Sequence, residues 1–157
     1  YLLDQFFSPL INKRTDAYNG YTLEGRTRIH MELIKGIRQV IGDKSLFALR
    51  LGGCDYTVGG TTIEDAVWAC RRFEEAGVDL LDISGGTCCY ARKGHNYPGY
   101  FGDISEAVKK EVHIPVLLTG GVRTVQDAEM LLKEEKADMI GVGRIITAKP
   151  DWGMELI

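Results

Sequence analysis

Four short apolar runs recur through the sequence, each bounded by glycine, proline, aspartate or serine, and they alternate with longer amphipathic stretches. The runs are Leu46–Leu51, Val78–Ser84, Ile114–Thr119 and Ala137–Val142. Runs of this length and composition are typical of strands that are buried on both faces, as in parallel sheets. The alternation therefore predicts an α/β chain in which four parallel strands alternate with helices.

The stretches between the runs have helical periodicity and recognisable ends. They are Thr22–Ile41, Thr62–Ala76, Asp103–Val112 and Val125–Glu134. In the first stretch we expect an apolar stripe to face the core, with charged residues on the opposite side, and its members are Leu23, Ile29, Leu33, Ile37 and Val40. Gly42 is expected to end this helix, and Thr124 to cap the last one.

The spacing of the runs separates a barrel from an open sheet. Strand starts lie roughly 23–36 residues apart, and a (β/α)8 TIM barrel of ~250 residues uses ~31 residues per unit. A doubly wound sheet is the rival architecture, but its phosphate-binding glycines follow the first strand, and here the glycine turns come late. The sequence therefore predicts the C-terminal half of a TIM barrel.

The chain of 157 residues is predicted to be one partial domain, 1–157. Residues 1–21 are expected to form a loop that follows a fourth strand outside the chain. Residues 22–157 are expected to be the last four βα units, and the final helix, which starts at Trp152, is expected to be incomplete. Because the sequence opens on Tyr1 and not on methionine, we expect a fragment of a longer protein.

Charge and cysteine spacing narrow the classes of function. The formal net charge is −3, and no basic footprint suggests nucleic acid or an anionic membrane as a partner. No run approaches the ~18 apolar residues of a membrane-spanning helix, and nothing resembles a secretory leader, so we expect a cytoplasmic location. The four cysteines show no C-x-x-C spacing, and we expect neither disulfides nor a metal site.

Two glycine-containing turns lie where a barrel commonly binds phosphate. Gly120 and Gly121 follow the third run, and Gly143 and Arg144 follow the fourth. Glycine lets backbone N–H groups approach an anion, and a guanidinium adds a rigid fork of donors. Because the loops after the last two strands of a TIM barrel often hold a phosphate, we predict that these residues bind one.

Arg50 interrupts the first apolar run, where a charge is costly unless it has a partner. Two interpretations are open. Arg50 either forms a structural ion pair with a carboxylate such as Asp82, or it is a cation at the top of the barrel that holds an anionic or electron-rich ring.

The other polar side chains are expected to be structural. Ser84 has no histidine nearby in the sequence, so a nucleophilic role is disfavoured. The histidines are assigned to a helix surface, a loop and the start of a strand, and they are His30, His95 and His113. The long loop 85–102 is expected to form part of a lid or a substrate wall. Its tyrosines are Tyr90, Tyr97 and Tyr100.

The opening of the chain carries a long and specific motif. It consists of Tyr1-Leu2-Leu3-Asp4-Gln5-Phe6-Phe7-Ser8-Pro9, then Asn12-Lys13-Arg14-Thr15-Asp16, Tyr18, Gly20, Arg26 and Arg28. This pattern resembles the Old Yellow Enzyme family of FMN-dependent NAD(P)H oxidoreductases, also described as NADH:flavin oxidoreductases / NADH oxidases. The chain departs from the family pattern at Asn19 (usually Gly), Thr22 (usually Ser) and Gly25 (usually Asn). We interpret these departures as tuning of a structural loop.

The resemblance implies roles for individual residues. Tyr1 would donate a proton to the α-carbon of the substrate during alkene reduction. Arg50 would contact the pyrimidine edge of the flavin, where negative charge accumulates on reduction. The FMN phosphate site would comprise Gly120, Gly121, Gly143 and Arg144. The implied cofactors are FMN and NAD(P)H as the reductant, and the implied acceptor is a small molecule such as an activated alkene.

The resemblance also implies what lies outside the chain. The family's substrate-anchoring pair, His-His or His-Asn, precedes Tyr1, and the first strands supply much of the contact with the flavin ring. We therefore expect the chain alone to be inactive, and to self-associate or to pair with the missing half-barrel. The alternative is a non-catalytic half-barrel that binds phosphate or only assembles with another half. A lyase or isomerase barrel is disfavoured because it would not require the opening motif.

Overall fold

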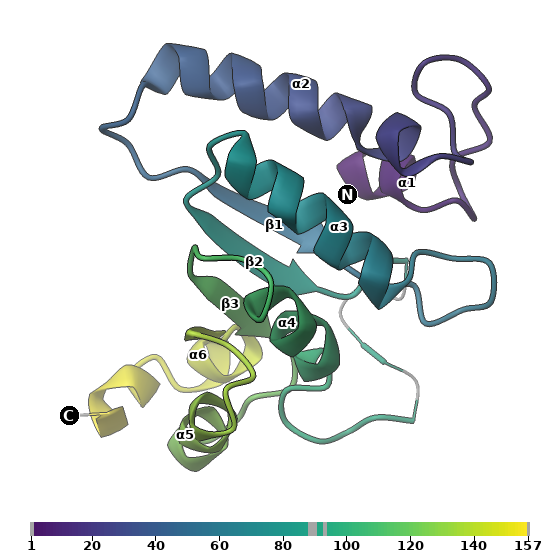
Figure 1. Cartoon of the computed structure of the whole chain (residues 1–157). Coiled ribbons are helices and arrows are strands. Elements are labelled where there is room, and N and C mark those ends of the chain that lie inside the picture. Colours follow the sequence, from purple (N-terminus) through teal and green to yellow (C-terminus); the bar gives the residue numbers. More distant parts are fainter. Residues whose placement is uncertain (1, 88–90, 93, 157) are drawn as a thin grey trace.

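The computed structural model describes residues 2–87, 91–92 and 94–156 as an alternation of helices and parallel strands (Figure 1). The elements are α1 (Leu2–Phe7), α2 (Leu23–Ile41), β1 (Ala48–Gly52), α3 (Ile63–Glu75), β2 (Leu80–Ser84), α4 (Gly102–Lys109), β3 (Val116–Thr119), α5 (Val125–Lys133), β4 (Met139–Gly141), α6 (Arg144–Ala148) and the 3-10 helix η1 (Trp152–Leu156). The strands form one sheet in the order β1-β2-β3-β4, and every pairing is parallel. The predicted α/β architecture is confirmed.

The sheet has one buried face and one open face. Helices α3 and α4 lie in front of the strands in Figure 1. The side chains that pack on the covered face, Leu51, Ile83 and Leu118, are almost fully buried. On the open face, the register places Arg50 opposite Asp82. The Arg50 side chain is exposed, and the Asp82 side chain is half-buried. The expectation that the strands are buried on both faces is therefore wrong for this chain.

Helix α2 turns a different face to the core from the one predicted. Arg26 and Ile34 are buried. Of the predicted apolar stripe, Leu23 and Ile29 are half-buried, and the other members are exposed: Leu33, Ile37 and Val40. A physical reason is that the Arg26 guanidinium has partners: its Nε donates to the Phe7 carbonyl at 2.6 Å, and its Nη2 lies 2.9 Å from Asp65 Oδ2. A partnered charge can be buried, and hydrophobic periodicity does not detect it.

His30 was predicted to lie on a helix surface, and the structure contradicts this. Its side chain is 1% exposed. The imidazole stacks on Phe73, with ring centroids 5.4 Å apart, and meets Phe7 edge to face at 6.0 Å. Neither ring nitrogen has a hydrogen-bond partner among the described residues. Burial lowers the pKa of His30 from 6.5 to about 4.

The motif at the start of the chain builds the connection between α1 and α2. The stretch 1–21, expected to be a loop, contains the short helix α1. Asn12 is buried, and its Nδ2 donates to the carbonyls of Phe6 and Tyr18, both at 2.9 Å. A Cβ at Gly20 would lie 1.8 Å from the Asn12 carbonyl oxygen. These motif residues therefore have a structural role in the connection between α1 and α2.

Asn19 and Gly25, two of the three departures from the family pattern, face each other. Asn19 Oδ1 accepts from the backbone N–H of Thr22 at 2.9 Å, and Thr22 Oγ1 caps α2 by accepting from Gly25 N–H at 3.0 Å. A Cβ at Gly25 would lie 2.6 Å from Asn19 Cγ. The family has glycine and asparagine at these positions in the opposite order, so the departure exchanges volume between two facing residues. This agrees with tuning of a structural loop.

The helix ends follow the predicted signals, but the helices near the C-terminus differ from the prediction. Thr124 caps α5 in a reciprocal arrangement with Asp127, and Gly42 ends α2 with a φ of 62°. The helix predicted from Trp152 is the 3-10 helix η1, and α6, which the pattern did not predict, directly follows β4. Trp152 is buried, and its Nε1 donates to the Arg123 carbonyl at 3.1 Å.

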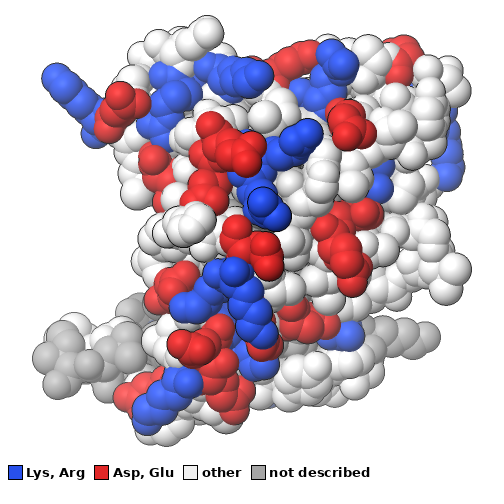
Figure 2. Space-filling view, viewed as in Figure 1, with Lys and Arg blue, Asp and Glu red and all other residues white. Residues whose placement is uncertain are grey.

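Charged side chains of both signs are interspersed over the helix-covered face of the molecule (Figure 2). Several pair between elements, such as Lys109 on α4 with Asp138 at 2.6 Å. Within the described part of the chain, no helix combines the length and the apolar composition needed to cross a membrane.

The variant His30→Leu tests the burial of the imidazole. Above pH ~6.5 His30 is neutral in both the folded and the unfolded chain. As the pH falls towards about 4, the unfolded chain takes up a proton that the folded chain does not, so unfolding is favoured. We expect the wild-type chain to lose about 3 kcal/mol of unfolding free energy relative to His30→Leu over this interval, measured by urea titrations at several pH values.

His113→Leu is the matched control, because the His113 side chain is 95% exposed. Its pH dependence should follow that of the wild type, since exposed ion pairs contribute little. Parallel curves for the wild type and His30→Leu would contradict the prediction.

Candidate functional site

A cavity of about 630 Å³ lies at the carboxyl ends of the strands. It is lined by side chains from three strands and by the turns after β3 and β4. Five predicted site residues line it, and they are Arg50, Gly120, Gly121, Gly143 and Arg144. Because parallel strands present their carboxyl ends at the same edge of the sheet, residues far apart in the sequence meet at this cavity.

Arg50 forms an ion pair and also borders the cavity. Its Nη1 lies 3.0 Å from Asp82 Oδ2, and its Nη2 donates to Thr119 Oγ1 at 3.4 Å. Burial raises the pKa of Asp82, and the nearby guanidinium opposes that rise. The Arg50 side chain is still 54% exposed. The ion-pair interpretation is therefore confirmed, and the pair leaves a cationic group on the cavity wall.

Gly120 and Gly121 are required first by their own backbone and by a neighbouring ring. Their φ angles are 125° and 75°, in the region that favours glycine. A Cβ at Gly120 would lie 2.9 Å from the Tyr100 ring, and one at Gly121 would lie 2.6 Å from it. The missing side chains at this turn therefore make room for Tyr100 as well as bordering the cavity.

Gly143 differs from the other two glycines. Its φ is −129°, outside the left-handed region, and a Cβ built on it would meet nothing within 4 Å. Gly143 is the N-cap of α6, and no side chain bonds to that end of the helix. The structure therefore leaves open space beside a turn that carries backbone N–H groups, a form suited to an anionic group.

Tyr100 connects the two glycine turns. Its side chain is buried, with its ring against Gly120 and Gly121. Its hydroxyl accepts a hydrogen bond from Arg144 Nη2 at 3.2 Å. The expectation that this tyrosine forms a wall of the site agrees with its place on the cavity lining. Tyr97 is half-exposed, with 52% of its surface accessible, and Tyr90 lies outside the described residues.

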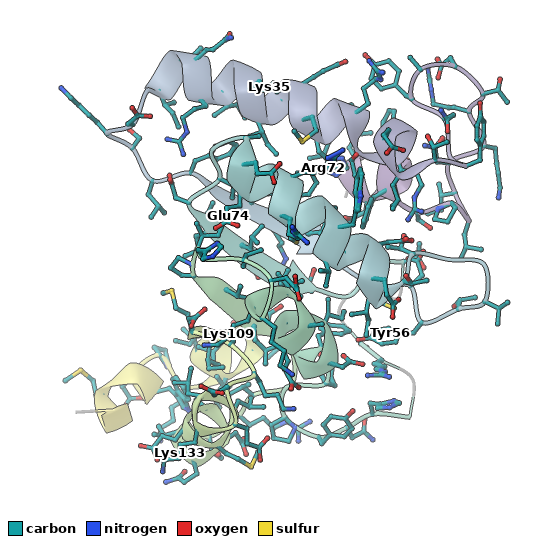
Figure 3. The ribbon with its side chains drawn as sticks, viewed as in Figure 1. Lys35, Tyr56, Arg72, Glu74, Lys109 and Lys133 are labelled. Atoms are coloured by element: carbon teal, nitrogen blue, oxygen red, sulfur yellow. The ribbon has the colours of Figure 1, made fainter. Side chains whose placement is uncertain are left out.

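A cluster around Asp103 fixes the segment that carries Tyr100. Asp103 accepts from Tyr56 Oη at 2.7 Å and from Arg92 Nη1 at 2.9 Å. The Arg92 guanidinium lies 3.8 Å from the centroid of the Tyr56 ring and donates to the Tyr100 carbonyl at 3.2 Å. Figure 3 labels Tyr56, which lies beside the connection between β2 and α4. The backbone of Tyr100 is thus held by groups that do not line the cavity.

Asp55 joins three segments at the same edge of the sheet. Its carboxylate is buried and accepts from Ser8 Oγ at 2.7 Å, from Thr61 N–H at 2.8 Å and from Thr87 N–H at 2.7 Å. Burial acts to raise the pKa of Asp55, but these hydrogen bonds outweigh it and the pKa is lowered overall. The carboxylate holds together the connections that follow α1, β1 and β2.

A second cavity of about 390 Å³ shares Arg50 with the first. Leu2, Leu3 and Asp4 line it from α1. Asp4 Oδ1 accepts from Gly52 N–H at 3.3 Å, and burial raises the pKa of Asp4. This contact ties α1 to the end of β1. Tyr1, the predicted proton donor, lies outside the described residues, so its role stays a prediction.

Other side chains considered at the sequence level have structural surroundings. Ser84 is buried and donates to the Leu51 carbonyl at 3.4 Å. Cys54 and Cys70 are buried, and Cys88 and Cys89 lie outside the described residues. Among the residues that the structure describes, no three His, Cys, Asp or Glu side chains are grouped to hold a metal ion.

The sequence did not single out Thr119 or Asp55. Thr119 ends its strand and could have been found from the parallel register, which aligns it with Gly141. Asp55 has no comparable signal, because its three donors come from separate parts of the chain.

The family model described as the NADH:flavin oxidoreductase / NADH oxidase family matches residues 1–156. An NADH oxidase of Thermoanaerobacter brockii is 33% identical over 156 residues, which cover 97% of this chain and 24% of that protein. An NADPH dehydrogenase of Halalkalibacterium halodurans is 37% identical over 155 residues, which cover 99% of this chain and 45% of that protein. The chain thus spans less than half the length of the curated relatives it matches.

A solved structure of a 2-naphthoyl-CoA reductase in complex with 2-naphthoyl-CoA has the same fold over this chain. The TM-score is 0.88 at 28% sequence identity, and the match covers 99% of this chain and 24% of the reductase. Such neighbours are TIM-barrel enzymes. The predicted fold, the C-terminal half of a (β/α)8 barrel, is therefore confirmed.

Alanine at the two kinds of glycine should have opposite consequences for stability. Gly121→Ala forces an unfavourable φ and a collision with the Tyr100 ring, so we expect it to lower the unfolding free energy by about 2 kcal/mol or more. Gly143→Ala meets open space, and we expect a change within about 0.5 kcal/mol. Urea denaturation of both variants measures the contrast, and similar losses would contradict it.

Proposed function

Because the chain belongs to the NADH:flavin oxidoreductase / NADH oxidase family, we propose that it provides the phosphate end of an FMN site. The site would serve an oxidoreductase that passes hydride from NAD(P)H through FMN to a small-molecule acceptor. One observation carries the proposal: Arg50 on β1 and the Gly143-Arg144 turn after β4 come from separate segments and line one cavity at the carboxyl ends of the strands.

The residues present fit such a group. The open space beside Gly143 admits a phosphate, and the backbone there and the Arg144 guanidinium supply donors for its oxygens. Arg50 lies on the same cavity wall and would face the pyrimidine edge of the ring, where a cation stabilises negative charge. Bound FMN supplies two-electron hydride chemistry that side chains cannot supply.

The acceptor that we propose is an activated alkene. Tyr1 would donate the proton to its α-carbon, as the family resemblance implies. The structural neighbour that reduces 2-naphthoyl-CoA, an aromatic acyl thioester, supports an acceptor whose unsaturation is conjugated to a carbonyl group. Asp82 would keep the Arg50 guanidinium oriented, since it already pairs with one of its nitrogens.

We further propose that the chain alone is inactive, because it spans only 24% and 45% of two curated relatives. The alternative is a non-catalytic half-barrel that binds phosphate or only assembles with another half. The colour of the full-length protein separates the two: a flavoenzyme shows a flavin absorption band that NAD(P)H bleaches under anaerobic conditions. A cytoplasmic location is proposed as well, and the free thiol of Cys70 supports it.

Paired titrations with FMN and riboflavin test the phosphate site. The two ligands differ only in the phosphate, so we expect FMN to bind roughly ten- to hundredfold more tightly, the strength of one or two charge-assisted hydrogen bonds. Gly143→Ala should weaken FMN and leave riboflavin unchanged, because its Cβ enters the open space beside the turn. Flavin fluorescence or calorimetry measures both affinities.

Equal affinities of the wild type for FMN and riboflavin would reject the phosphate site. Arg144→Gln is a second arm, and it should reduce the preference for FMN without changing the binding of riboflavin. An equal loss for both ligands in either variant would also contradict the proposal.

We also propose that another half-barrel, either a second copy or the rest of a longer protein, covers the open parts of this chain. Strands β1 and β4 each have one unpaired edge within the described sheet. The apolar side chains on α2 that remain exposed are Leu33, Ile37 and Val40. Surfaces of this kind favour association.

Size-exclusion chromatography of the chain at micromolar concentration tests this association. We expect a dimer or a larger species, and we expect the double variant Ile37→Lys/Val40→Lys to shift the chain towards the monomer. Both residues are exposed, and lysine is favourable near the end of a helix, so the fold should persist. A wild-type monomer under these conditions would contradict the proposal.

A further inference from the structure

Tyr100 is held at the cavity by contacts of its ring and of its backbone. Its ring packs edge to face on Phe101, with centroids 4.7 Å apart, and it fills the space over Gly120 and Gly121. The backbone on either side is fixed, because Gly99 N–H donates to the Gly120 carbonyl at 2.7 Å and Arg92 donates to the Tyr100 carbonyl. The hydroxyl therefore has one well-defined position at the cavity.

Arg144, by contrast, is the first residue of the short helix α6 and is exposed. Among the described residues it has no carboxylate partner within ion-pair distance, so its charge is not neutralised there. A free arginine side chain samples many rotamers, and that freedom is lost when it binds a ligand. Its Nη2 donates to Tyr100 Oη at 3.2 Å, which leaves the other guanidinium N–H groups for a ligand.

From this geometry we propose that Tyr100 is a positioning residue for the phosphoryl end of the cofactor, which it serves by holding the Arg144 guanidinium at the cavity wall. The proposal rests on the proposed FMN site and specifies which side chain preorganises it. The phenol ring gives the hydroxyl a rigid base, and the hydroxyl restricts the guanidinium before the ligand arrives. The affinity for the phosphate therefore depends on a side chain that need not touch it.

The same contacts separate this role from simple packing. Packing over Gly120 and Gly121 uses the ring, whereas the contact with Arg144 uses only the hydroxyl. Tyr100→Phe removes the hydroxyl and keeps the ring. Tyr97→Phe is the matched control, because Tyr97 lies in the same segment, is half-exposed and does not line the cavity.

The experiment compares FMN and riboflavin binding in the full-length protein that contains this chain. We expect Tyr100→Phe to weaken FMN roughly three- to tenfold, the strength of one hydrogen bond, and to leave riboflavin unchanged. Its midpoint of urea unfolding without ligand should match the wild type, and Tyr97→Phe should bind both ligands as the wild type does.

A double-mutant cycle shows whether the effect passes through the arginine. In the Arg144→Gln background, Tyr100→Phe should cause no further loss of FMN affinity, because the group it positions is already absent. An additional loss of the same size in that background would overturn the proposal, as would equal weakening of FMN and riboflavin by Tyr100→Phe.

The outcomes distinguish this inference from the function on which it rests. If the wild type and Gly143→Ala behave as a phosphate site requires but Tyr100→Phe binds FMN normally, the positioning role is wrong and the FMN site stands. If the wild type shows no preference for FMN over riboflavin, the site and the positioning role are both rejected.

Discussion

The parallel, in-register pairing of the four strands is the constraint on which the site depends. It aligns Arg50 with Asp82 and Asp82 with Leu117, and it brings every strand to its carboxyl end at the same edge. The turns after β3 and β4 must then start side by side, although a whole helix separates them in the sequence. Helices α3 and α4 cover one face of the sheet and hold the strands in this arrangement. The place of the site thus follows from the packing of the core.

The order of the elements could be predicted from the sequence because the signals for it are local. Short apolar runs, a capping threonine at Thr124 and a terminating glycine at Gly42 each act within one or two turns of the chain. The buried face of α2 could not be predicted in this way. Arg26 and His30 are buried because of partners that the fold brings to them, in one case Asp65 and in the other the ring of Phe73. The hydrophobic periodicity of a helix contains no information about such partners.

In the candidate site, too, some features could be predicted from local signals and others depend on the fold. Glycines and arginines at strand ends are visible in the sequence, and the structure brings five of the predicted residues to one cavity. The different structural roles of the glycines cannot be recognised in the sequence: Gly121 accommodates the Tyr100 ring, whereas Gly143 borders open space. The groups that fix the surroundings, such as Asp55 with its donors from three segments, are recognised only after the chain has folded.

Asn19 and Gly25 constrain each other at the start of α2. The Asn19 amide occupies the volume that a side chain at position 25 would need. A chain that acquired asparagine at both positions would suffer a clash, and one with glycine at both would lose the acceptor for Thr22 N–H. The cost of a substitution at either position is therefore set by the residue at the other.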